Sequence, residues 1–289
     1  MLQQMREFGI VPGHMPDDQS ITRQCAGRDV VALLPAAGSG TRIAPIPGSK
    51  EVFPIGFANV ESDKPEVKVV SQYLLDLMVA GGVGQGIIVL RDGKWDIPAY
   101  FGEGEPAGMK LSYMVVGQTL GPPDTLDRAY AFVRHNVVAF GFPDIMLDPP
   151  DVFDQLLTRM DVDDVDVVLG LYDVVDPHQS DIVELDEENR VLDIHLKDAT
   201  SILPHCWGCA VWGPAFTEFM HGAIREHRNH TAGSFGTIDA GGDLPMGLIF
   251  KQAVEENFKV VGVPFEGQHW TDVGSPRSLM RMAGRLRGR

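Results

Sequence analysis

Short apolar runs that alternate with segments of helical spacing place the strongest limit on the fold of this chain. The runs contain many β-branched residues and have the length of buried strands. They lie at residues 30–36, 86–90, 111–116, 137–142 and 166–172. Residues 69–82 and 124–136 carry apolar residues three and four positions apart, as amphipathic helices do. This alternation predicts an α/β fold in which helices cover both faces of an open, mostly parallel sheet.

The pattern changes in the second half of the chain. Residues 181–197 carry apolar residues at every second position on both sides of the polar sequence DEEN, which predicts a β-hairpin. Another strand is expected at residues 259–265, and the chain from Ser275 onward has helical spacing. We therefore expect a Rossmann-like, mixed sheet with an inserted β-hairpin.

Length and composition predict one folded domain. Residues 1–28 are polar and rich in turn-forming residues, which favours a flexible N-terminal extension. With 289 residues, of which 44% are hydrophobic, the chain can bury a sizeable core. We therefore expect residues 29–289 to form a single domain.

Charge and hydropathy limit the partners of the protein. The 24 basic and 40 acidic residues give a net charge of −16, which opposes broad attraction to nucleic acid or to an anionic membrane. No apolar stretch approaches the roughly 20 residues that span a bilayer, and the N-terminus lacks the apolar centre of a signal peptide. We expect a cytoplasmic protein without nucleic-acid or membrane partners. The sequence does not determine the oligomeric state, and a homo-oligomer stays open.

The segment LLPAAGSGTRIAPIPGSKEVFPIG follows the first apolar run and combines features of an anion site. Gly38 and Gly40 allow a tight turn whose backbone N–H groups can approach a phosphate, which a Cβ atom would hinder. Arg42 adds a forked cation and Lys50 a point charge. The spacing fits neither the Walker motif nor the dinucleotide-binding glycine motif. An ordinary strand-to-helix turn with incidental cations is the alternative.

This segment resembles the signature of the sugar-1-phosphate nucleotidylyltransferases, A-x-G-x-G-T-R followed by a proline-containing spacer, a lysine and P-[IV]-G. The resemblance implies a nucleotidyltransferase domain over residues 29–289. It also implies that Ala37, Gly38, Gly40 and Thr41 bind substrate, and that Arg42 and Lys50 are the catalytic cations. The family joins a nucleoside triphosphate to a sugar 1-phosphate and releases pyrophosphate with Mg²⁺, which are the partners and the cofactor that we expect.

Two aspartates are candidate metal ligands. An apolar strand delivers Asp144 to its carboxyl end, where ligands of open α/β sheets gather, although an aspartate that caps a turn is the alternative. Asp144 matches the metal aspartate of the family, while Phe142 and Pro143 depart from its L-G-D pattern. Asp272, in HWTDVGSP, matches the W-x-D-x-G-[TS]-P motif and would be the second carboxylate on Mg²⁺.

The sugar and base regions resemble the family less closely. Lys197 matches the lysine of an E-K-P motif that binds the sugar phosphate, but Leu196 replaces the glutamate and Asp198 the proline. A solvated lysine after a hairpin is the alternative. Trp207 and Gly208 correspond to the strand that lines the sugar pocket in the family, so we expect them to border the substrate.

The nucleobase remains open at this stage. Gln118 could read a pyrimidine edge because its amide both donates and accepts hydrogen bonds, which favours dTTP or UTP. Asp124 occupies the position at which a glycine in the family lets the base approach. Two other functions remain possible: a non-catalytic nucleotide-binding or sugar-nucleotide-binding regulator of the same fold, and a glycosyltransferase of related fold.

Overall fold

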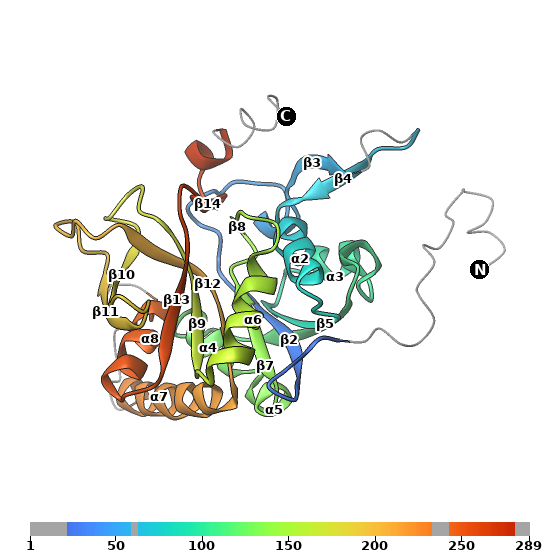
Figure 1. The fold of residues 1–289 in the computed structure, drawn as a ribbon. Coiled ribbons are helices and arrows are strands. Elements are labelled where there is room, and N and C mark those ends of the chain that lie inside the picture. Colours follow the sequence, from blue (N-terminus) through green and yellow to red (C-terminus); the bar gives the residue numbers. More distant parts are fainter. Residues whose placement is uncertain (1–21, 59–62, 233–242, 281–289) are drawn as a thin grey trace.

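The computed structural model describes residues 22–58, 63–232 and 243–280 (Figure 1). Within these ranges a large mixed sheet has the strand order β11-β10-β12-β7-β2-β5-β6. Its strands are β2 (Arg28–Ala36), β5 (Gln85–Arg91), β6 (Lys110–Val116), β7 (Val137–Gly141), β10 (Asp181–Leu185), β11 (Val191–Leu196) and β12 (His205–Trp212). Strand β1 (Gln24–Cys25) pairs with β2, and β9 (Val167–Asp173) and β13 (Val260–Phe265) extend the sheet beside β12.

The sheet has a parallel half and a largely antiparallel half. Strands β7, β2, β5 and β6 run parallel, as the apolar runs predict. Strand β12 pairs antiparallel with β7, β9 and β10, and the β10–β11 hairpin lies at the far edge, at the left of Figure 1. The mixed α/β sheet and the inserted hairpin are therefore confirmed.

Helices cover both faces of the large sheet. The side chains of β2 alternate between the two cores that these helices form with the sheet. Val30, Ala32 and Leu34 point into one core, with α2 (Val70–Ala80), α3 (Asp96–Phe101) and α6 (Val152–Asp163). Val31 and Leu33 point into the other. This second core contains apolar residues of α4 (Pro122–Asp127), α5 (Tyr130–Val133), α7 (Pro214–Ala232) and α8 (Met246–Glu255). Both faces of β2 are thereby buried.

The described structure also contains two small antiparallel sheets, two 3₁₀ turns and a helical segment at residues 276–280, which agrees with the helix expected from Ser275 onward. Strands β3 (Pro54–Ala58) and β4 (Glu66–Val69) form one ribbon, and β8 (Ile145–Met146) and β14 (Thr271–Asp272) form the other. The turns are η1 (Lys50–Val52) and η2 (Glu105–Ala107). Neither ribbon was expected from the sequence, because such short strands carry too few residues to show a period.

Local boundaries differ from expectation at two places. Cys25, which the sequence places in the N-terminal extension, is buried on β1, so residues 22–28 belong to the fold; residues 1–21 lie outside the described part. The helix expected at residues 124–136 is divided into α4 and α5. Among the described helices, none has the length and apolar character needed to cross a membrane.

Candidate active site

One large cavity lies at the carboxyl ends of the parallel strands. Its volume is about 930 Å³, and its wall includes residues that directly follow β2, β6 and β7. Ligands of open α/β sheets bind at this edge. All the site residues expected from the sequence line this cavity: Ala37, Gly38, Gly40, Thr41, Arg42, Lys50, Gln118, Asp144, Lys197, Trp207, Gly208 and Asp272.

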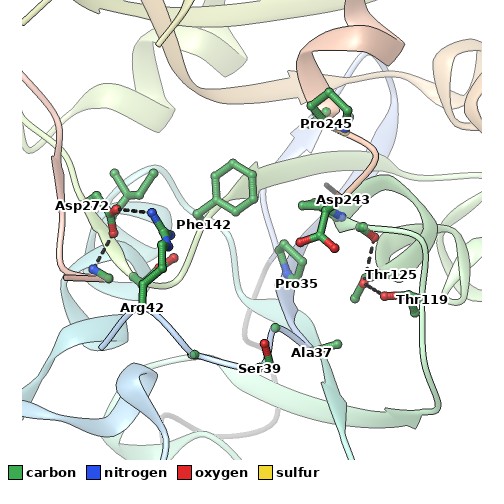
Figure 2. A pocket seen from close by; sticks show the side chains of 18 of the residues that line it. Pro35, Ala37, Ser39, Arg42, Thr119, Thr125, Phe142, Asp243, Pro245 and Asp272 are labelled. Carbon is green, nitrogen blue, oxygen red and sulfur yellow. Dashed lines mark hydrogen bonds and ion pairs between the residues drawn. The ribbon is translucent and has the colours of Figure 1, made fainter. Parts of the chain in front are cut away.

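The glycine loop forms one wall of the cavity. Figure 2 shows the chain passing from Pro35 and Ala37 through Ser39 to Arg42 along this wall. A Cβ atom added to Gly38 would meet no protein atom within 4 Å, so protein packing does not require a glycine there. Gly40 has φ +65°, a conformation that favours glycine. The open space beside Gly38 is therefore available to a ligand.

Lys50 lines the same cavity as the glycine loop and is partnered by Asp144. The ammonium group of Lys50 forms an ion pair and hydrogen bond with Asp144 Oδ2, and both side chains are largely buried. Burial by itself lowers the pKa of Lys50, but the charge and hydrogen bond of Asp144, with smaller effects of Glu51 and Asp272, raise it overall. Lys50 is therefore a fixed positive charge in the cavity.

Asp96 holds the backbone that precedes Lys50, a role that sequence reasoning missed. Its carboxylate accepts hydrogen bonds from the amide and the hydroxyl of Ser49, at 2.5 and 2.7 Å. A Cβ atom on Gly48 would lie 2.7 Å from Asp96 Oδ2, so glycine permits this approach. The sequence gives no signal for the contact, because Asp96 lies on α3, far from Lys50 along the chain.

Arg42 and Asp272 form a second ion pair in the cavity. Arg42 Nη1 lies 3.4 Å from Asp272 Oδ2, and Figure 2 shows the two side chains facing each other. The Arg42 side chain is 66% exposed, so it can reorient toward a ligand. Asp272 also accepts a hydrogen bond from the amide of Gly274, where a Cβ atom would lie 2.6 Å from Asp272 Oδ1.

The β8–β14 ribbon brings the two aspartates together. Asp272 pairs with Ile145, and the amide of Val273 donates to the carbonyl of Asp144 over 2.8 Å. The pKa of Asp272 is raised, first by burial and then by the negative charge of Asp144. Two adjacent carboxylates at the cavity wall fit Mg²⁺, which binds a few carboxylates and completes its shell with water and phosphate oxygens. In the described part of the chain, no cluster of three or more potential protein ligands surrounds them.

The part of the cavity around Gln118 corrects the expected placement of Asp124. Gln118, Thr119, Gly121 and Thr125 line it, and Figure 2 shows Asp243 beside Thr125 on this side. Asp124 does not line the cavity. It is 1% exposed and binds Arg228, Arg128 and the amide of Leu120. Gly117 and Gly121, the latter with φ +143°, line this part of the cavity, so Asp124 does not narrow it.

Lys197, Trp207 and Gly208 line one part of the cavity, as expected from the sequence, and Asp181 joins them there. Lys197 lines the cavity with φ +48°, a strained conformation for a residue other than glycine. Leu196 instead packs against an apolar core, whereas Asp181, which sequence reasoning overlooked, reaches the cavity. Gly208 lies between two rings, because a Cβ atom there would be 2.9 Å from Tyr172 and 3.2 Å from Trp270.

No protein-family model matches the chain. It is 24% identical over 251 residues to the low-salt glycan biosynthesis nucleotidyltransferase Agl11 of Haloferax volcanii, covering 86% of this chain and 63% of the relative. It is 23% identical over 251 residues to the glucose-1-phosphate thymidylyltransferase of Streptomyces antibioticus, covering 87% of this chain and 64% of the relative. The chain thus spans less than two thirds of the length of these curated relatives.

Solved structures share the fold. A UDP-glucose pyrophosphorylase bound to UDP-glucose matches with a TM-score of 0.70 and 17% identity, covering 89% of this chain and 98% of that one. A candidate glucose-1-phosphate thymidylyltransferase from Bacillus anthracis matches with a TM-score of 0.70 and 16% identity, covering 89% and 95%. Sequence and fold together confirm that this chain resembles the sugar-1-phosphate nucleotidylyltransferase family.

Proposed function

We propose that this protein transfers a nucleotidyl group from a nucleoside triphosphate, with dTTP or UTP favoured, to a sugar 1-phosphate. The observation that carries the proposal is that the glycine loop, two cations and two adjacent carboxylates share one cavity with Lys197 and Trp207. The names of the relatives, a nucleotidyltransferase and a glucose-1-phosphate thymidylyltransferase, support it. The products are a nucleoside diphosphate sugar and pyrophosphate.

The reaction requires two anions to approach each other. An oxygen of the sugar phosphate attacks the α-phosphorus, the bond from this phosphorus to the bridging oxygen breaks, and pyrophosphate leaves. The attacking oxygen is already ionised at neutral pH, so the site needs no strong general base. Positioning and charge neutralisation are therefore the main tasks of the protein.

The residues of the cavity suit these tasks. The open wall at Gly38 and Gly40 gives backbone N–H groups access to the triphosphate, and Arg42 and Lys50 would neutralise the departing pyrophosphate. Lys197 would orient the sugar phosphate. Asp144 and Asp272 would hold Mg²⁺, whose positive charge would offset the repulsion of the two anionic substrates.

The nucleotide preference rests on Gln118. Its amide lines the cavity and can both donate to and accept from the edge of uracil or thymine. Thr119 and Thr125, whose hydroxyls lie 2.8 Å apart, stand on the same side.

A matrix of nucleoside triphosphates against sugar 1-phosphates, read as pyrophosphate release with Mg²⁺, tests the proposal. We expect the highest kcat/KM for dTTP or UTP. A clear preference for ATP, GTP or CTP would overturn the role of Gln118 but leave nucleotidyl transfer intact. If nucleotides bind but no pair of substrates releases pyrophosphate, the protein is a binding protein instead of an enzyme of this class.

A further inference from the structure

The β10–β11 hairpin places a carboxylate directly opposite the position where the family glutamate is missing. Asp181 and Leu196 are partners in the antiparallel register of the hairpin. Leu196 packs against the core that contains apolar residues of α8, whereas Asp181 lines the cavity. The chain therefore supplies an acidic side chain to this part of the cavity from β10.

The packing of α8 gives a structural role to only one of the two carboxylate oxygens of Asp181, which is Oδ2. A Cβ atom on Gly247 would lie 2.3 Å from Asp181 Oδ2, so the first turn of α8 rests against this oxygen. Asp181 Oδ1 is also buried, but it has no hydrogen-bond partner among the residues that the structure describes. An unpaired buried carboxylate oxygen is costly. A purely structural role of Asp181 leaves this cost unexplained.

An unpaired donor lies near this oxygen. Trp207 Nε1 is buried and likewise lacks a hydrogen-bond partner within the described ranges. Burial raises the pKa of Asp181, and the charge of Lys197 and the donor groups of the Trp207 indole and the Lys197 backbone oppose that rise. These donors therefore face the carboxylate, but among the described residues none has hydrogen-bond geometry to Oδ1. Asp181, Trp207 and Lys197 therefore share one corner of the cavity.

A single hydroxyl group would satisfy both unpaired atoms. It can accept a hydrogen bond from Trp207 Nε1 and donate its own proton to Asp181 Oδ1. The ammonium of Lys197 in the same corner suits an anionic group on the same molecule. A ligand that carries both a phosphate and hydroxyl groups matches this chemistry.

We propose that Asp181 and Trp207 bind a hydroxyl group of the sugar 1-phosphate and select for sugars that carry it. This inference rests on the proposed function, since it names the sugar contact of that same site. Asp181 thus replaces, from the neighbouring strand, the glutamate that Leu196 does not provide. A site built for a hydroxyl rejects the deoxy analogue strongly, because the analogue leaves buried polar groups unpaired.

Calorimetric binding of glucose 1-phosphate and of inorganic phosphate tests the inference without turnover. The wild-type protein should bind glucose 1-phosphate more tightly than phosphate. Asp181→Asn should weaken glucose 1-phosphate binding about tenfold and Asp181→Ala by about 10- to 100-fold, while phosphate binding stays unchanged. Glu184→Gln, on the same strand but outside the cavity, is the matched control.

Monodeoxy glucose 1-phosphates identify the hydroxyl. One of them should bind the wild type weakly, and Asp181→Ala should cause no further loss for that analogue alone. In steady-state turnover by Asp181→Ala, the KM for the sugar phosphate should rise above the wild-type value, while the KM for the nucleotide stays constant. Equal binding of glucose 1-phosphate to wild type and Asp181→Ala, or equal losses for every deoxy analogue, would overturn the role of Asp181. If this binding pattern holds but no pyrophosphate is released, the proposed reaction fails and the sugar contact stands.

Discussion

The amide of Val273 donates to the carbonyl of Asp144 over 2.8 Å, and this bond places Asp272 beside Asp144. The two carboxylates come from distant parts of the sequence, yet the β8–β14 ribbon fixes their relative position. Each is partnered by a cation, Lys50 for Asp144 and Arg42 for Asp272. The site therefore balances two negative and two positive charges at one end of the cavity.

Asp144→Asn and Asp272→Asn should each lower Mg²⁺-dependent turnover by about 100-fold or more, because an amide keeps the shape of the side chain and loses its charge. Mg²⁺ should raise the Tm of the wild type and not that of either variant, since a ligand that binds only the folded state stabilises it. Asp164→Asn, on the protein surface, serves as the control. Unaltered rates and an unaltered Mg²⁺ effect on Tm in one variant would remove that aspartate from the metal site.

Arg42→Ala should reduce kcat while changing the free energy of unfolding by less than about 0.5 kcal/mol, because the side chain is 66% exposed. Pyrophosphate release at saturating nucleotide and urea unfolding measure the two effects. Arg28→Ala removes an exposed arginine outside the cavity and should leave both unchanged. Full activity of Arg42→Ala would contradict its assignment to the departing pyrophosphate.

Gly38→Ala should separate ligand binding from folding. The added methyl group meets no protein atom within 4 Å, so we expect a change in unfolding free energy of less than about 1 kcal/mol. It should nevertheless weaken nucleotide binding about tenfold or more, because it occupies space next to the backbone N–H groups. Titration calorimetry with the favoured nucleotide measures this loss.

Gly208→Ala provides the contrast to Gly38→Ala. Its methyl group would lie 2.9 Å from the Tyr172 ring, so this variant should lose about 1–3 kcal/mol of stability. Undisturbed nucleotide binding by Gly38→Ala would show that the glycine loop does not contact the triphosphate.

Lys50→Met should destabilise the protein by about 1–3 kcal/mol at neutral pH, since it leaves the largely buried Asp144 without its cation. The folded protein raises the pKa of Lys50 above its ordinary value of 10.5. The ion pair therefore contributes fully to the stability of the folded state below pH 10.5. This stabilisation is lost as the pH rises through the pKa of Lys50 in the folded protein. The stability difference between wild type and variant should shrink over this alkaline range.

Urea unfolding at a series of pH values measures this difference. Lys259→Met, which breaks an exposed ion pair with Asp164, should cost less than about 1 kcal/mol. A Lys50→Met variant as stable as the wild type at neutral pH would show that the pair with Asp144 contributes nothing to folding.

The parallel half of the sheet could be predicted from the sequence, because its strands are short continuous apolar runs. In β2, Val31 and Leu33 are buried on one face and Ala32 and Leu34 on the other. The glycine loop with Arg42 and Lys50 was also recognisable from the local sequence. These residues lie close together along the chain, and their spacing alone brings glycines and cations to one end of a strand.

Contacts between distant segments were decided by the tertiary structure. Asp124 could be assigned to the base site from the sequence, but Arg228 of α7 binds it and it does not line the cavity. The sequence did not identify Asp181 as a cavity residue. Its position opposite Leu196 depends on the register of the hairpin, and the close approach of Gly247 on α8 depends on tertiary packing. Local patterns determine which segments become strands and helices, whereas register and long-range packing determine which side chains share a cavity.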